Sequence, residues 1–139
     1  MDQLSRVDFA SLVRPASPNS FLLAPRGACA TARIDEEAVV YGITAGSLRQ
    51  AFLRVALAAP RVSHVLKDDV GLYDNLVVRS ALFRFPDLVA ARFFNVGDGC
   101  STLAVYSRSV YGHSDLGVNA KRIGSWVGAL RPFAAPVSR

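Results

Sequence analysis

The feature that most constrains the fold is a run of apolar segments between residues 62 and 110, separated by very short turn-forming links. Links this short join antiparallel strands, because a parallel pair needs a crossover of about a dozen residues or more. The three links are Asp74 with Asn75, Pro86 with Asp87, and the Gly-Asp-Gly of residues 97–99. The segment therefore predicts a four-stranded antiparallel meander, with strands at residues 62–73, 76–85, 88–96 and 101–110.

A helix is predicted directly before the meander. Residues 44–60, TAGSLRQAFLRVALAAP, place apolar side chains three and four positions apart, as on one face of a helix. Thr44 or Ser47 is suited to cap its first turn. Pro60 ends it, because the residue before a proline avoids the helical conformation.

The first 43 residues have a different character from the rest of the chain. They are rich in proline and other turn-forming residues, with one short apolar run at Phe21, Leu22 and Leu23. We expect residues 1–43 to form an extended N-terminal arm around a helix–four-strand–helix core at 44–131, with a C-terminal tail at 132–139. The predicted fold class is a single α+β domain, a four-stranded antiparallel meander packed by two helices.

Composition narrows the function classes. Of the 139 residues, 16 are basic and 11 acidic, a net charge of +5, and the arginines are scattered without any block of like charge. Nucleic-acid-binding proteins gather their charge into a patch or stripe, so no nucleic-acid partner is expected. Cys29 and Cys100 have no second cysteine or histidine at metal-ligand spacing, so we predict two reduced thiols, no metal site and no cofactor.

The beginning of the chain, MDQLSRVDFASLVRP, lacks the apolar run of a signal peptide, and no stretch approaches the length of a membrane span. The expected location is cytoplasmic, with membrane association only at the periphery and through a partner.

The lengths of the turns predict which side chains share a face of the sheet. If Phe85 opposes Leu88 and Val96 opposes Ser101, the helices cover a face that includes Phe83, Phe85, Leu88, Ala90, Phe94, Leu103 and Val105. The opposite face then carries arginines and aromatic rings, the composition of many binding surfaces. We predict that this face binds a partner or ligand through Arg84, Phe93, Tyr106 and Arg108. The alternative is that the face is simply solvated.

The stretch YGHSDLGVNAKRIGSWVGAL, residues 111–130, concentrates polar residues and glycines ahead of a second helical pattern. Ser114 or Asp115 can accept hydrogen bonds from the free amides of the first helical turn, which is typically worth about 1 kcal/mol. Gly112 and Gly117 let the chain bend out of the preceding strand. Arg122 is expected to reach back to Asp115 or to a carboxylate on a strand.

A catalytic interpretation of the same stretch is weaker. Ser107, His113 and Asp115 are the residue types of a catalytic triad, but sequence neighbours rarely form one and no nucleophile elbow is present. We therefore predict no catalytic residues.

Several motifs resemble the bacterial and plastid family known as domain of unknown function 1499: SPN at 17–19, DD at 68–69, RFPD at 84–87 and YSRSVYGHSDLGVNAKRI at 106–123. The family commonly has an arginine directly after the asparagine, where this chain has Ala120, and many members carry an N-terminal membrane or export segment that this sequence lacks. The resemblance implies a fold and no reaction. The positions that match the family's motif are Ser107, Arg108, Gly112, Ser114, Asp115, Gly117, Asn119 and Arg122.

Three functions remain open. The first is a non-catalytic accessory protein that docks onto a larger protein assembly, for example a membrane-associated complex of the respiratory type. The second is a protein that binds a small apolar ligand, a lipid or quinone, between the sheet and the helices. The third and weakest is a hydrolase.

Overall fold

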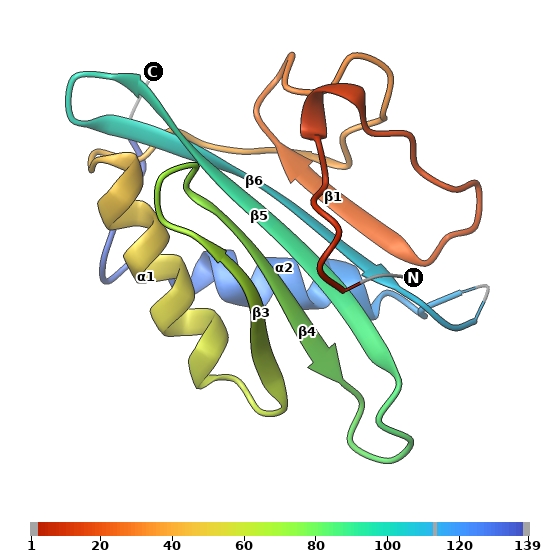
Figure 1. Ribbon diagram of the computed structural model, residues 1–139. Coiled ribbons are helices and arrows are strands. Elements are labelled where there is room, and N and C mark those ends of the chain that lie inside the picture. The colour runs from red at the N-terminus through yellow and green to blue at the C-terminus, as the bar shows by residue number, and fades with distance from the viewer. Residues whose placement is uncertain (1–2, 113, 138–139) are drawn as a thin grey trace.

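The computed structural model describes residues 3–112 and 114–137 and shows an α+β fold built on one mixed sheet of six strands (Figure 1). The sheet order is β2-β1-β6-β5-β4-β3, antiparallel throughout except for the parallel pair β1 and β2. The strands are β1 (Ser20–Ala24), β2 (Glu36–Glu37), β3 (Val62–Asp68), β4 (Tyr73–Arg79), β5 (Pro86–Gly97) and β6 (Cys100–Ser109). The helices are η1 (Phe9–Ser11), a 3₁₀ turn, with α1 (Ala45–Ala58) and α2 (Val118–Gly128).

The α+β class is confirmed, but the prediction of a four-stranded sheet is wrong. The four predicted strands correspond to β3–β6, and β1, which lies within the predicted arm, pairs with β6. Local sequence signals do not predict this pairing, because the paired residues lie more than 80 positions apart and their pairing depends on long-range contacts.

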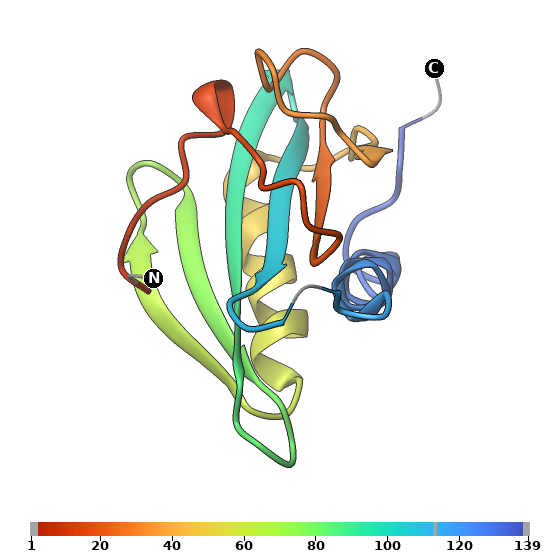
Figure 2. The same ribbon diagram turned by 90° about the vertical axis from the view of Figure 1, so that its right-hand side faces the viewer.

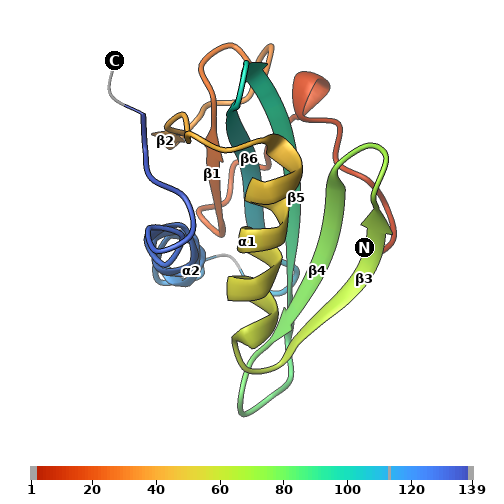
Figure 3. The same ribbon diagram turned by 90° about the vertical axis from the view of Figure 1, so that its left-hand side faces the viewer.

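The first helix begins and ends as predicted. The Thr44 side chain accepts a hydrogen bond from the Ser47 amide at the start, and the last helical residue, Ala58, lies two before Pro60. Both helices cover one face of the sheet, and the segment before β1 crosses the other (Figures 2 and 3). Between sheet and helices, Phe52 packs edge-on against Phe93 and Trp126, at centroid distances of 5.5 and 5.9 Å.

The predicted assignment of side chains to faces is confirmed for β6, where Leu103 and Val105 lie toward the helices, and is wrong for β4 and β5. Asn95, and not Val96, opposes Ser101, and the link between β4 and β5 spans residues 80–85 instead of two. A register shift of one residue moves every side chain of a strand to the other face. The helices therefore cover Val89, Ala91 and Phe93, together with Leu103 and Val105 of the neighbouring strand.

The opposite face is also buried. Ala90 and Tyr106 pack there with Tyr73 and Leu22 beneath Phe9 of η1. Both faces of the sheet are thus covered.

Candidate functional site

A buried polar network joins β5, β6 and α2. The hydroxyl of Ser107 donates a hydrogen bond to the side-chain oxygen of Asn119 over 2.6 Å and accepts one from Arg122 Nη1 over 3.0 Å. Arg122 also donates to Asn119 Oδ1 over 2.8 Å, and its Nη2 forms an ion pair with Asp87 at 2.8 Å. Arg122 was expected to pair with Asp115 or with a carboxylate on a strand, and its partner is the strand residue Asp87.

Asn119 is the centre of this network, with no exposed surface. Its side-chain amide nitrogen donates to the backbone oxygen of Asn19, to the hydroxyl of Ser109 and to the carboxylate of Asp115, over 3.1, 3.0 and 2.7 Å. One buried amide therefore connects three segments that resemble the family's motifs and lie far apart in the sequence: 17–19, 106–123 and, through Arg122, 84–87.

Of the two residues predicted to accept from the first turn of α2, the structure confirms Asp115. The helix begins at Val118, and its N-cap, Gly117, has a positive φ of 81° and no side-chain hydrogen bond. Asp115 lies two residues before the N-cap. One of its carboxylate oxygens accepts a hydrogen bond from the amide of Gly117 and the other from the amide of Asn119. Ser114 accepts only from Leu116, so it does not cap the helix.

The catalytic alternative gains no support from this geometry. Ser107 is fully buried, and its hydroxyl is engaged with Asn119 and Arg122. His113 lies outside the described residues. Within the described ranges, no group of three or more histidine, cysteine or acidic side chains is placed to hold a metal ion.

Two exposed loops extend from the network. The β4–β5 loop, residues 80–85, projects beyond the end of the sheet (Figures 1 and 3), and residues 110–112 and 114–117 lie between β6 and α2. The rings of Phe83 and Phe85 stack at 5.4 Å, and Phe85 contacts Tyr111 at 5.3 Å across the two loops. We call Leu82, Phe83, Phe85 and Tyr111 the aromatic tip.

Arginines surround the base of the aromatic tip. The Arg61 side chain donates to the backbone oxygen of Arg79, and the Arg79 side chain donates to that of Arg84. All three are exposed, and none forms an ion pair with another described residue. Arg84 also has a positive φ of 59°, a strained backbone that turns the loop sharply.

The aromatic tip is not predicted by the sequence pattern, which places Phe83 and Phe85 on the helix-covered face of a strand instead of in the β4–β5 loop. The available signal was Pro86. A proline is tolerated at the first residue of a strand, so β5 can begin there and leave the preceding aromatic residues in a loop.

The predicted partner face is not one surface. Phe93 is buried against α1, whereas Tyr106 is buried on the opposite face of the sheet. Arg84 lies in the β4–β5 loop. Arg108 shares the face of Tyr106, and its Nη1 atom is buried without a hydrogen-bond partner among the described residues.

A second ionic cluster was not predicted. Asp74 of β4 is fully buried, and its two carboxylate oxygens accept from Arg49 Nε and Nη2 of α1, each over 2.8 Å. His64 Nε2 lies 2.8 Å from the same carboxylate, and Arg49 also pairs with Asp69. The hydrogen bonds that Arg49 donates to Asp74 are the main cause of the raised Arg49 pKa, and the hydrogen bond that it donates to Asp69 lowers the pKa of that carboxyl group. This cluster fixes α1 to the sheet.

Fold and site together define a class of protein: an α+β domain whose buried polar network supports two exposed loops. Residues 13–130 of the 139 match a known family. The chain belongs to the family described as "Protein of unknown function (DUF1499)". No curated protein and no solved structure matches it. Among the described residues, no helix has both the length and the apolarity to cross a bilayer.

Proposed function

We propose that the protein is a non-catalytic accessory protein that docks onto a larger protein assembly through the aromatic tip. The observation that carries the proposal is the exposure of four large apolar side chains at one projecting end. Leu82, Phe83, Phe85 and Tyr111 are 79, 67, 50 and 61% exposed. Contiguous exposed apolar patches are uncommon on proteins that act alone, and they often mark binding surfaces.

The chemistry of the aromatic tip resembles the energetic centre of protein interfaces. Aromatic residues and arginine are enriched there, and a few such side chains account for most of the binding free energy. Stacked rings also lose little conformational entropy on binding, because Phe83, Phe85 and Tyr111 already contact one another.

The arginines at the base of the tip specify the partner further. Arg61, Arg79 and Arg84 place positive charge around an apolar projection. The complementary surface is an apolar pocket with an acidic rim, because opposite potentials favour encounter and orientation. The buried network supports this role, since Arg122 holds Asp87, two residues after Phe85, to α2.

The alternative of a lipid or quinone between sheet and helices has no specific observation in its favour. Phe52, Phe93 and Trp126 occupy that space and contact one another.

The experiment is affinity purification of the tagged full-length chain from the cells that produce it, from both soluble and detergent-solubilised membrane fractions. Wild type is compared with the double variant Phe83→Ser/Phe85→Ser. We expect a stoichiometric companion with wild type and at least about a tenfold loss with the variant, since hot-spot residues contribute about 2 kcal/mol or more.

The matched control is Leu57→Ser/Val70→Ser, which removes two exposed apolar side chains outside the aromatic tip. It should retain the companion. The proposal is wrong if wild type is recovered alone, if the tip variant retains its companion, or if wild type binds anionic lipid vesicles through the tip and no protein.

A further inference from the structure

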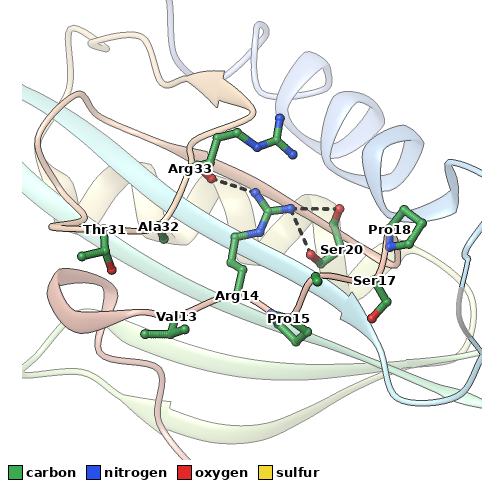
Figure 4. A pocket seen from close by; sticks show the side chains of 10 residues that line it. Val13, Arg14, Pro15, Ser17, Pro18, Ser20, Thr31, Ala32 and Arg33 are labelled. Atoms are coloured by element: carbon green, nitrogen blue, oxygen red, sulfur yellow. Dashed lines mark hydrogen bonds between the residues drawn. The ribbon is translucent and has the colours of Figure 1, made fainter.

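A pocket of about 510 Å³ lies where the segment before β1 passes the loop before β2, far in sequence from the aromatic tip. Figure 4 shows Arg14 in its centre, with Ser17, Ser20 and Arg33 around it. Val13, Pro15 and Pro18 add apolar walls. The pocket therefore combines cationic groups, hydroxyls and apolar surface, a lining typical of sites for small ligands.

Arg14 is held rigidly. Its Nη1 donates to the backbone oxygen of Arg33 over 2.7 Å, and its Nη2 donates to the backbone oxygen and hydroxyl of Ser20 over 3.2 and 3.0 Å. A guanidinium fixed in this way is preorganised, so a ligand that binds beside it need not order a flexible side chain.

Positive charge exceeds negative charge at the pocket. Asp35 pairs with both Arg14 and Arg33, at 2.8 and 3.1 Å, and also accepts a hydrogen bond from the amide of Leu22. One carboxylate thus serves two guanidinium groups. The Arg33 side chain is 80% exposed, so most of its donors remain free for a ligand.

A third arginine lies beside the pocket and forms no ion pair with another described residue. Arg108 of β6 is the register partner of Ser20, so the two side chains leave the sheet on the same face. The guanidinium carbons of Arg108 and Arg14 lie 5.1 and 5.9 Å from the centre of the same ring, that of Tyr106. Burial lowers the pKa of Arg108.

A buried guanidinium nitrogen without a hydrogen bond is unusual, because most buried polar groups form hydrogen bonds and a buried charge is costly unless it is paired. Nη1 of Arg108 has no hydrogen-bond partner among the described residues. A bound anion would provide the compensating charge for the three arginines.

We propose that this arginine pocket binds an oxyanion, the phosphate or carboxylate group of a small ligand. Arg33 and the hydroxyls of Ser17 and Ser20 contact the anion, Arg14 and Arg108 provide positive charge beside it, and the prolines pack against the organic part of the ligand. Planar guanidinium groups suit this chemistry, since their paired donors match two oxygens of a phosphate or carboxylate. The site does not depend on docking through the aromatic tip.

The test is a titration of the ¹⁵N-labelled full chain with inorganic phosphate and, separately, with acetate, at constant ionic strength set by chloride. We expect saturable shifts of the amide signals of residues 14–20 and 31–35, apart from Pro15 and Pro18, which have no amide proton. Arg33→Gln should weaken binding by about tenfold, the equivalent of one charge-assisted hydrogen bond. Arg26→Gln is the matched control, because Arg26 is also exposed and paired with a carboxylate but lies outside this pocket. It should leave the affinity unchanged.

A second variant tests Arg108. Phosphate should raise the melting temperature of wild type, whereas Arg108→Met should lose most of that rise. Co-sedimentation with phosphatidic acid vesicles distinguishes the source of the anion: vesicle binding that phosphate displaces indicates a lipid headgroup, and phosphate binding without vesicle binding indicates a soluble ligand. The proposal is overturned if the anions give no saturable shift, if chloride gives the same shifts, or if Arg33→Gln and Arg26→Gln weaken binding equally.

Discussion

The hydroxyl of Ser107 and the side-chain oxygen of Asn119 lie 2.6 Å apart in a site without solvent access, and together they connect the end of β6 to the first turn of α2. Polar residues at these positions could equally belong to a reactive centre. Here every polar group of Asn119 is used to join backbone segments, so the pair acts as a structural connection that holds the exposed loops.

Replacement of Asn119 by Ala should lower the free energy of unfolding by about 2–3 kcal/mol, because it leaves buried partners such as Ser107 without a hydrogen bond. Urea unfolding followed by circular dichroism measures this. Ser125→Ala, on the exposed side of the same helix, is the control and should change stability by less than about 0.5 kcal/mol. Equal effects of the two variants would contradict the central role of Asn119.

The ion pair between Arg122 and Asp87 should be energetically coupled, since both side chains are largely buried and their atoms lie 2.8 Å apart. A double-mutant cycle with Arg122→Met and Asp87→Asn should give a coupling energy of about 1–3 kcal/mol. If the two effects simply add, the pair does not hold the β4–β5 loop to α2.

The parts of the fold that the sequence predicted are those set by local chemistry. Thr44 and Pro60 bound α1 through capping and proline geometry, and Gly97 with Gly99 flanks the tight connection between β5 and β6. These signals act within a few residues, so the structure they predict does not depend on the rest of the chain.

Asp74 and Asn75 show why other parts were missed. Both residues favour turns locally, yet they lie inside β4 and are buried. Arg49 of α1 neutralises Asp74, and the side chain of Asn75 donates to the backbone of Gln3 and Ser5. Partners this distant in sequence override a local preference and cannot be inferred from it.

The folded protein should be strongly destabilised when one partner of the buried pair Asp74 and Arg49 is removed. Asp74→Asn keeps the shape of the side chain but leaves Arg49 without its main counterion, at a cost of about 3–5 kcal/mol. Thermal unfolding checks this. Asp69→Asn removes the exposed partner of the same arginine and should have a far smaller effect, so similar losses for both variants would show that burial is not the cause.

The β3–β4 turn should make stability depend on pH. The pKa of Asp68 is lowered from its usual 3.8, first by the hydrogen bond from the Gly71 amide and then by that from Arg6. A carboxyl group with a lower pKa in the folded state binds fewer protons there than in the unfolded chain. Its contribution is therefore complete above about pH 4–5 and is lost as the pH falls through the lowered value.

Urea midpoints measured between pH 6 and pH 2.5 should thus fall less steeply for Asp68→Asn than for wild type, because the variant has no carboxyl group to titrate at this position. Asp98→Asn, in the exposed β5–β6 turn, removes the same charge without the Gly71 and Arg6 contacts and should keep the wild-type slope. A wild-type slope for Asp68→Asn would mean that these contacts do not favour the charged carboxylate.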